Sequence, residues 1–583
     1  MKTFRMKKML VASMCVGVLI LGCTDTKPSK IISNSAPEQN SIKIFSLVEN
    51  QDIIKQINTE LKSKPSAAGG KSYYVCDTGD DNNDGKSEAT PFRTYEKGLS
   101  QFNQLLGGES VLFCRGGEFV SEVKKSLFNQ NCSASAVCTI GAYGEIVEGL
   151  DNRPTLMVTN ATAAMDFFEG GSPDVDGGYV VKDLILMSDE TTLFGVHLTN
   201  DVDHVTLDNL HIQGFRIGVY SSGAGETTNP DINRLNDDLK LINSTITGNY
   251  GQGWLGGCTD CLIENNSFIN NGFANPVKNH NLYISGFKNY PTSGLVVRGN
   301  TLYKSTHVDG KCQGVSLVGH GVMNNVLIEN NIIKEDEGAA TTACWGIAID
   351  TGYNYEEAFT DLIIRNNTVI NVGGQAIGCS SCVNVQIEGN TVLDPAGLLY
   401  EAIRVPNRAE DSVKSKNVLI ANNEVVLDGL QSAGIRVEGE HPFEVVNNKV
   451  SQIEGSTGIC IKKIGANKLI ETSTNQCLTH SEMKFVEENS GEEIQSGDLS
   501  YFSPVDEPLL VEGLSEESVP EEPLFDRVEE AEELEEVGEV KPVQNSAIKN
   551  TTYKPGGIFS STGSSGSTAC QVYARGRCLL FGR

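Results

Sequence analysis

One short motif returns through the middle of the chain and limits what the chain can fold into. Its clearest copy is Leu362-Ile-Ile-Arg-Asn-Asn-Thr-Val-Ile370: a branched apolar residue, any residue, a small polar pair ending in Asn, then a polar and an apolar residue. Aligned turn positions recur every 22 to 36 residues, at Leu184, Leu210, Ser244, Asn266, Asn300, Asn331, Asn367, Asn390, Asn423 and Asn448. A period with a fixed minimum and irregular excess predicts a solenoid whose insertions fall at one corner.

Each copy reads as strand, turn and strand, because apolar and polar residues alternate and the segments are too short for helices. Turns stacked in register place one Asn above the next, so that their side-chain amides hydrogen-bond along the axis. The pattern therefore predicts an all-β fold, a right-handed parallel β-helix of about ten rungs. We expect it to span residues 71–480, with a cap at its N-terminal end.

These copies resemble the right-handed parallel β-helix family that includes pectate-lyase-like polysaccharide lyases and uronan epimerases. The segment Tyr73–Phe119 looks like the opening module of many carbohydrate-active β-helices. Such a module covers strand edges and core at the open end of the coil. The resemblance implies the fold, but the same coil serves lyases, hydrolases, epimerases, tailspikes and adhesins, so it does not select a reaction.

The charge of the chain excludes one class of partner. The net charge is −29, whereas nucleic-acid binding requires a basic face. Much of this charge is local, since residues 506–539 hold 15 acidic residues against Arg527 alone. Residues 481–565 therefore indicate an acidic low-complexity linker that buries too little apolar surface to fold. Residues 566–583 indicate a small loop closed by Cys570 and Cys578.

The N-terminus indicates export. Residues 1–22 combine a basic start with a short apolar run, which is typical of a signal peptide and too short for a membrane span. Leu19-Ile-Leu-Gly-Cys23 resembles a bacterial lipobox, which implies lipidation of Cys23 and a cell-envelope protein anchored to the outer membrane or cell surface. We expect the protein to be a monomer. Residues 23–70 would be the tether. Plain secretion with cleavage nearby is the alternative.

Fourteen cysteines remain after Cys15 and Cys23, and an even number in an exported chain favours disulfides. Three of them lie 12, 13 and 12 residues past a turn Asn and are expected in one column: Cys312, Cys344 and Cys379. We predict the pair Cys312–Cys344, with Cys379–Cys382 as its consequence. A zinc site shared between Cys258, Cys261, Cys379 and Cys382 is disfavoured, because four rungs separate the two pairs, so Cys258–Cys261 is also expected as a local disulfide.

A possible calcium loop lies in the opening module. Asp80-Asp-Asn-Asn-Asp-Gly85 matches the start of an EF-hand-type loop, with Asp80, Asn82 and Asp84 as oxygen ligands. The later Glu is missing, because Pro91 stands at the twelfth place. Two interpretations stay open, a structural turn and a bound Ca²⁺.

A second strand between the motifs predicts an outward column of side chains: His197, Tyr220, Tyr283, Ser316, Ala348, Arg404 and Arg436, with Asp350 and Glu438 two residues further along. By resemblance, this face floors the sugar groove. A uronan lyase must neutralise a carboxylate, remove a proton and protonate the leaving oxygen. The prediction assigns proton transfer to Lys278, His280 and Tyr283. Substrate contacts are assigned to Tyr220, Ser316, Asp350, Arg404 and Arg436.

Tyr283 and Arg404 are expected four rungs apart, roughly 19 Å, so they cannot share one sugar ring. The sequence therefore predicts a catalytic centre at the Tyr283 end and substrate subsites at the arginines, with Asp350 orienting groups or helping to bind Ca²⁺. Gly319-His-Gly321 resembles a short element of polygalacturonases, but the other elements of that family are not found. A non-catalytic glycan-binding β-helix, a glycoside hydrolase and an epimerase remain alternatives to the lyase.

Overall fold

A computed structural model describes residues 70–479 and two short strands near the C-terminus, 572–574 and 577–579. Within the first range the gaps are 124, 169–176, 200, 224–234, 354, 395–396, 410, 429–431, 440–442, 454–455, 457, 466–468 and 471–473. The predicted signal peptide, the lipidation site Cys23 and the acidic linker lie outside the described residues. Among the described helices, none has the length and apolarity needed to span a membrane.

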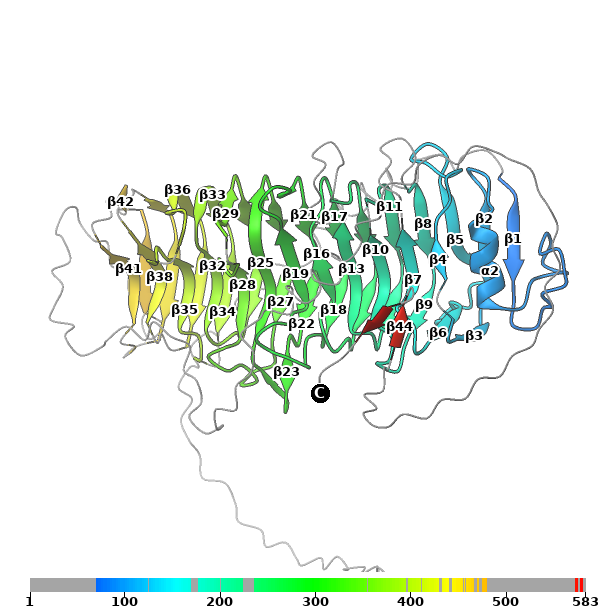
Figure 1. Ribbon diagram of the computed structural model, residues 1–583. Helices are drawn as coiled ribbons and strands as arrows, with labels where there is room; N and C mark the ends of the chain where they lie inside the picture. The colour runs from blue at the N-terminus through cyan, green and yellow to red at the C-terminus, as the bar shows by residue number, and fades with distance from the viewer. Residues whose placement is uncertain are drawn as a thin grey trace, which may run out of the picture. The chain divides into compact units, whose positions relative to one another are not determined.

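The described chain is a parallel β-helix in which each turn contributes strands to three sheets (Figure 1). Sheet B contains β3 (Glu118–Ser121), β6 (Thr155–Val158), β9 (Ile185–Met187), β12 (His211–Gln213), β15 (Thr245–Thr247), β18 (Ser267–Ile269), β22 (Thr301–Tyr303), β27 (Ile332–Lys334), β31 (Thr368–Ile370), β34 (Thr391–Asp394), β37 (Glu424–Leu427), β40 (Lys449–Gln452) and β43 (Gln476–Thr479). These thirteen strands exceed the ten turn positions read from the sequence, because β3 and β6 precede Leu184 and β43 follows Asn475.

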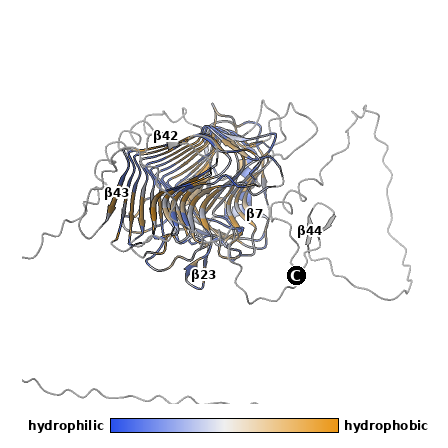
Figure 2. Ribbon diagram, turned by 90° about the vertical axis from the view of Figure 1, so that its left-hand side faces the viewer, coloured by the Kyte–Doolittle hydropathy of each residue, from blue (hydrophilic) through white to orange (hydrophobic). Residues whose placement is uncertain are grey.

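Sheet A precedes sheet B in each turn. It contains β1 (Ser72–Val75), β2 (Ser110–Cys114), β5 (Cys138–Tyr143), β8 (Tyr179–Lys182), β11 (Val205–Asp208), β14 (Lys240–Ile242), β17 (Leu262–Glu264), β20 (Thr292–Ser293), β21 (Val296–Arg298), β26 (Leu327–Glu329), β29 (Ala358–Thr360), β30 (Ile363–Arg365), β33 (Cys382–Glu388), β36 (Lys416–Ala421), β39 (Phe443–Val446) and β42 (Leu469–Ile470). Figure 2 shows the coil from the side of β42 and β43, with the strands of each sheet behind one another.

Sheet C follows sheet B and carries the candidate site. It contains β4 (Ser126–Leu127), β7 (Ala163–Phe168), β10 (Phe194–Thr199), β13 (Ile217–Gly223), β16 (Trp254–Gly256), β19 (Leu282–Gly286), β25 (Val315–Asn324), β28 (Trp345–Ile349), β32 (Gln375–Cys379), β35 (Glu401–Val405), β38 (Ala433–Glu438) and β41 (Ile459–Ile464). The long strand β25 runs on from sheet C into sheet A, where it pairs with β29.

The corner between sheets A and B holds the predicted asparagine ladder. From Asn266 to Asn475, the Nδ2 group of each ladder Asn donates to Oδ1 of the next at 2.9–3.0 Å. The residue before each ladder Asn from Asn266 to Asn448 has a left-handed backbone, for example φ 53° at Asn366 and 63° at Gly389. Asn and Gly tolerate this conformation, which explains why the motif requires a small polar pair ending in Asn.

The interior of the coil is filled by the branched residues that begin each motif. Ile263, Val297 and Ile328 have no exposed surface, and neither do their counterparts Ile364, Ile387, Ile420 and Val445. Strict alternation places these residues inward and their neighbours outward. The repeat thus determines both the corner and the core.

The N-terminal end is closed by a short helix, α2 (Tyr95–Phe102). Thr94 caps it, since its hydroxyl accepts the backbone N–H of Lys97 at 3.2 Å. Leu99 and Phe102 are fully buried, and the Phe102 ring lies 5.3 Å from the ring of Tyr179 in β8. This arrangement agrees with the predicted cap over the first coil.

The disulfides predicted from the sequence are present: Cys258–Cys261, Cys312–Cys344 and Cys379–Cys382. Three further pairs are Cys76–Cys114, Cys132–Cys138 and Cys460–Cys477. The expected single column was wrong for Cys379, which lies opposite Ile349 at the end of β32, whereas Cys344 precedes β28. The connection from sheet B to sheet C differs in length between the two turns. Two cysteines at a similar distance in sequence from their ladder Asn therefore do not lie at equivalent places on sheet C.

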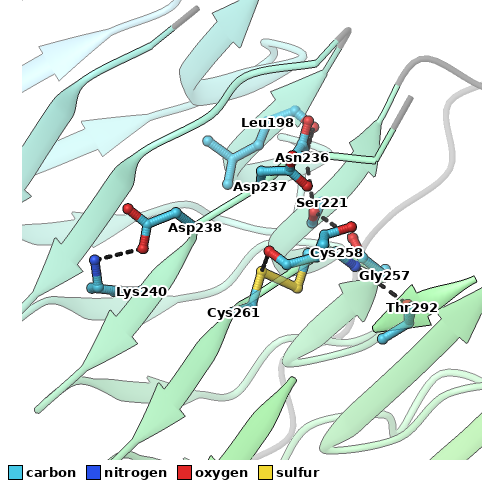
Figure 3. The surroundings of a disulfide bond; sticks show 12 residues. Leu198, Ser221, Asn236, Asp237, Asp238, Lys240, Gly257, Cys258, Cys261 and Thr292 are labelled. Atoms are coloured by element: carbon cyan, nitrogen blue, oxygen red, sulfur yellow. Dashed lines mark hydrogen bonds and ion pairs between the residues drawn. A yellow bond between two sulfur atoms is a disulfide. The ribbon is translucent and has the colours of Figure 1, made fainter. Parts of the chain in front are cut away.

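The Cys258–Cys261 disulfide lies at the corner where sheet C turns into sheet A (Figure 3). The buried Asn236 donates from Nδ2 to the carbonyl of Leu198 at 3.1 Å and to Ser221 Oγ at 2.9 Å. Ser221 Oγ in turn donates to the carbonyl of Gly257 at 2.9 Å. These bonds tie three successive turns together at this corner.

Two short hairpins lie outside the three sheets. One projects between sheets B and C and pairs β23 (His307–Val308) with β24 (Lys311–Cys312). The other pairs β44 (Val572–Ala574) with β45 (Arg577–Leu579), within the segment where a small Cys loop was predicted.

Candidate functional site

The outer face of sheet C carries a central column of residues, one from each turn. Backbone pairing aligns this outward column as Asp166, His197, Tyr220, Leu255, Tyr283, Val318, Ala348, Gly378, Arg404, Arg436 and Lys462. The prediction of Ser316 in this column was wrong, because β25 is shifted by two residues and places Val318 opposite Ala348. Ser316 itself is buried. Tyr283 and Arg404 are four strands apart, as the sequence predicts.

The column residues from Tyr220 to Ala348 are mostly apolar and buried. Tyr220 and Tyr283 are only 4% and 8% exposed, and with Phe194, Leu255 and Val318 they form a cluster separate from the core inside the coil. Tyr220 stacks on the ring of His197 at 5.3 Å. The predicted substrate contact at Tyr220 therefore faces other protein groups.

His280 is buried beside Tyr283, with ring centres 5.6 Å apart, and its Nδ1 lies 3.1 Å from the carbonyl of Val315. Burial, with a smaller contribution from His320, lowers the pKa of His280 to about 3. The hydroxyls of Tyr283 and Tyr353 lie 3.0 Å apart, which places the segment 350–357 over this end. His280 is thus a neutral, enclosed group. Lys278 precedes β19, is partly exposed, and accepts a hydrogen bond from Gln252 Nε2 at its backbone carbonyl.

His320 lies one strand further along on the same face and is partly exposed. Its Nδ1–H donates to the carbonyl of Asp350 at 2.6 Å, so the lone pair is on Nε2. Burial lowers the pKa of His320, which favours the neutral imidazole. Its ring lies between those of Tyr283 and Tyr353, at 5.4 and 5.7 Å.

The open half of the face begins at β28 and contains a small pocket over Gly378, with a cavity volume of about 20 Å³. Trp345 and Gln375 line the side where the strands begin, and Arg404 lies at one end. Asp350, Ser380, Pro406 and Arg408 line the side where the strands end, together with Ile349 and Cys379. A Cβ at Gly378 would lie 1.7 Å from Gln375 Nε2, so a larger residue there would displace the end of the Gln375 side chain.

Asp350 is held by Arg408, a residue that the sequence analysis did not single out. The Arg408 guanidinium contacts Asp350 directly and lies 3.0 Å from Asp411, whose side chain is fully buried. Ser380 Oγ and the backbone N–H of Thr351 donate to Asp350 at 2.6 and 2.8 Å. Although burial acts to lower it, the two carboxylates raise the pKa of Arg408. Asp350 is therefore a firmly oriented carboxylate at the pocket wall.

Arg404 and Arg436 are neighbours, as predicted, but both are engaged by two glutamates. Arg436 lies 2.8 Å from Glu401 and 2.7 Å from Glu438, while Arg404 lies 3.5 Å from Glu401 and 3.4 Å from Glu438. Glu401 is 2% exposed. Glu438 pairs with these two arginines, whereas Asp350 pairs with Arg408. A substrate carboxylate would have to compete with these internal partners.

The predicted calcium ligands are turned toward their own loop. Asp80 Oδ1 accepts the backbone N–H and the side-chain amide of Asn82, both at 2.9 Å. Asp84 Oδ1 accepts the N–H of Lys86 and the hydroxyl of Thr90. This geometry is that of an Asx-type turn, and calcium binding stays a prediction.

The sequence interpretation missed the importance of three residues: Trp345, Gly378 and His320. Trp345 begins a strand whose register could not be fixed from the sequence, and Gly378 has no side chain that would indicate a function. His320 was noted only within Gly319-His-Gly321. The available signal was position, because His320, Asp350 and Ser380 follow column residues by two on successive strands.

No family model matches the sequence. The chain is similar to lacto-N-biosidase of Bifidobacterium longum subsp. longum, with 27% identity over 351 residues, which cover 56% of this chain and 20% of that protein. This chain thus matches about a fifth of the length of that relative.

Similar solved structures include the GH136 lacto-N-biosidase from Eubacterium ramulus, at 13% identity over 74% of this chain and 70% of that chain, with a TM-score of 0.43. Another is the catalytic domain of a GH87 alpha-1,3-glucanase in complex with tetrasaccharides, at 12% identity over 70% of each chain, with a TM-score of 0.44.

Proposed function

We propose that the protein is a carbohydrate-active enzyme that binds a glycan in the pocket over Gly378 and hydrolyses a glycosidic bond there. The observation that carries the proposal is the composition of the pocket: an aromatic wall at Trp345, a side-chain-free floor at Gly378 and one oriented carboxylate at Asp350. Aromatic rings stack on the apolar faces of sugars, and carboxylates stabilise the positive charge that develops when a glycosidic bond breaks.

The charge balance around the pocket favours a neutral sugar over a uronate at this position. Arg408 is shared by two carboxylates, and Arg404 and Arg436 are matched by Glu401 and Glu438. Among the described residues that line the pocket, no arginine lacks an acidic partner. The sequence match to a protein named lacto-N-biosidase also supports hydrolysis.

Asp350 is the one carboxylate among the described pocket-lining residues, so the proposal assigns it the reacting role. Its contacts with Ser380, Thr351 and Arg408 hold its oxygens in a fixed orientation, as suits a nucleophile or a stabiliser of the cationic transition state. The arginines on β35 and β38 extend the surface along which neighbouring sugars would bind.

Polysaccharide lyase activity is the second candidate, and one observation favours it. His320 is neutral with Nε2 as the basic nitrogen, and it adjoins the Tyr283–Tyr353 hydroxyl pair. In β-elimination, Nε2 would accept the proton next to the carboxylate and a tyrosine hydroxyl would protonate the leaving oxygen. This moves the proposed base from the enclosed His280 to His320.

The deciding experiment incubates the purified protein with neutral oligosaccharides and with acidic polysaccharides. New reducing ends without ultraviolet absorbance from unsaturated products, lost in Asp350→Asn and kept in the exposed control Glu444→Gln, support the hydrolase. Unsaturated products lost in a His320→Gln variant would replace it with the lyase. Binding of a glycan without any product would indicate a non-catalytic glycan-binding protein.

We also propose that the protein is anchored by lipid at Cys23 and is located in the cell envelope. Replacing Cys23 with Ser and fractionating the cells tests both points, because loss of the acyl chains should release the protein from the membrane fraction.

A further inference from the structure

Three polar side chains on β7, β10 and β13 form a hydrogen-bonded chain well away from the pocket. Asp166 Oδ1 lies 2.9 Å from His197 Nδ1, and His197 Nε2 lies 3.4 Å from Ser222 Oγ. His197 is five strands from Ala348 along the outward column, so this group is separate from the glycan site proposed above. A nucleophile, a base and an orienting carboxylate within this reach are the signature of covalent catalysis.

Ser222 reaches His197 because of a β-bulge. Leu198 pairs with Ser221 and Thr199 with Gly223, which leaves Ser222 as the extra residue of β13. Gly223 has φ 63°, a left-handed conformation that glycine adopts without strain. Bulges redirect side chains, and this one brings the hydroxyl back across the strand toward the imidazole.

The imidazole is fixed in the orientation that a base requires. Asp166 is 4% exposed, and its second oxygen, Oδ2, accepts the hydroxyl of Ser126 at 3.3 Å. The His197 ring lies against Phe194 at 4.6 Å and is parallel to Tyr220 at 5.3 Å. Since Asp166 accepts the Nδ1 proton, the lone pair of Nε2 points to Ser222.

The Ser222 hydroxyl has two backbone carbonyls besides His197 within reach. The carbonyls of Leu198 at 3.2 Å and of Gly223 at 3.4 Å compete with the imidazole for its proton. The Leu198 carbonyl already accepts Asn236 Nδ2 at 3.1 Å, as the dashed line between these residues in Figure 3 shows. The Leu198 carbonyl therefore keeps a hydrogen bond when the hydroxyl turns to the imidazole.

We propose that Ser222, His197 and Asp166 form a second active centre that hydrolyses carboxylic esters. Ser222 Oγ attacks the ester carbonyl while its proton passes to His197 Nε2. The tetrahedral intermediate expels the alcohol, which takes that proton, and leaves an acyl group on Ser222. Water then attacks the acyl group, giving one proton to His197, and the carboxylic acid leaves as Oγ recovers its proton.

The substrate class follows from the position of the centre. It shares the outer face of sheet C with the pocket, so the alcohol half is assigned to a glycan hydroxyl, a point that rests on the proposed function. The acyl half is short, because Ser222 is 3% exposed and the rings of Phe194 and Tyr220 crowd the base. An acetyl ester on a sugar fits both conditions.

The test uses the purified protein with a fluorophosphonate probe and 4-nitrophenyl acetate, and therefore does not depend on any glycan. Peptide mass spectrometry should find the probe on Ser222, and Ser222→Ala and His197→Gln should each lower ester hydrolysis by about 100-fold or more. Asp166→Asn should lower it less, with a shifted pH profile. Ser451→Ala, a buried serine of sheet B, is the control and should retain the full rate.

Fluorophosphonate labelling absent from Ser222 in the folded wild-type protein would overturn the proposal, as would a full esterase rate in Ser222→Ala. If His197→Gln does not fold, probe labelling and Ser222→Ala still decide the outcome. Esterase activity without cleavage of any glycan would leave this centre in place and remove only the assignment of its alcohol half.

Discussion

The asparagine corner and the outer face of sheet C belong to the same turns of the coil but follow opposite rules. At the corner, successive turns repeat the same side chain and the same hydrogen bonds from Asn266 to Asn475. On the outer face, consecutive column residues change from Tyr283 to Val318, Ala348, Gly378 and Arg404. Repeated side chains at the corner stabilise the coil, whereas varied side chains on the outer face of sheet C can form binding and catalytic sites.

The largest expected effect separates activity from stability on the outer face. Asp350→Asn should lower the turnover of a cleaved glycan by about 1000-fold, because it removes the charge of the proposed reacting carboxylate. Thermal unfolding should change little, since Asn retains an oxygen for the Ser380 and Thr351 donors. A variant that loses stability while keeping its turnover per folded molecule would assign Asp350 a structural role instead.

The ladder should show the reverse behaviour. Asn331→Ala removes the bonds to Asn367 and to the carbonyl of Val297 and leaves the N–H of Asn300 without its acceptor. We expect the free energy of unfolding to fall by about 3 kcal/mol, with unchanged activity of the folded fraction. Denaturant titration measures this change, and Gln386→Ala, an exposed amide of β33, should differ from wild type by less than about 0.5 kcal/mol.

Trp345→Ala sharpens the distinction between binding and chemistry within the pocket. Loss of the aromatic wall should raise the dissociation constant for an oligosaccharide by about 10-fold and change turnover of the bound substrate less. Trp345→Phe should recover most of the affinity. Equal affinities for all three proteins, measured by calorimetry, would place the sugar elsewhere.

The enclosure of His280 should make the stability of the protein depend on pH. The pKa of His280 is lowered to about 3 in the folded chain, against about 6.5 when unfolded, so the unfolded chain binds more protons below 6.5. Stability is full above that value and declines as pH falls toward 3. The loss should reach about 1.4 kcal/mol at pH 5.5 and be absent in His280→Gln. Equal pH slopes for both proteins would show that His280 is not enclosed.

Much of the fold was determined by local sequence alone. The turn needs a left-handed residue followed by an amide that bonds to its copies, and pairs such as Asn-Asn or Gly-Asn supply both. The asparagine ladder could therefore be predicted from the sequence. The inward-facing residues and the N-terminal cap could be predicted as well. The sequence also predicted three disulfides: Cys312–Cys344, Cys379–Cys382 and Cys258–Cys261. The expected alignment of Cys312, Cys344 and Cys379 in one column was wrong for Cys379.

The functional face required the tertiary structure. Loops of variable length between sheets B and C set the register of sheet C, and a two-residue shift replaced Ser316 with Val318. Ion pairing depends on groups brought together from several turns, so Arg404 and Arg436 were read as substrate clamps although Glu401 and Glu438 already hold them. Burial depends on what the covering segment packs against, and this enclosed His280 while leaving Asp350 at a pocket. Side-chain alternation is a local property of the chain, whereas register, charge pairing and enclosure are set by contacts between turns.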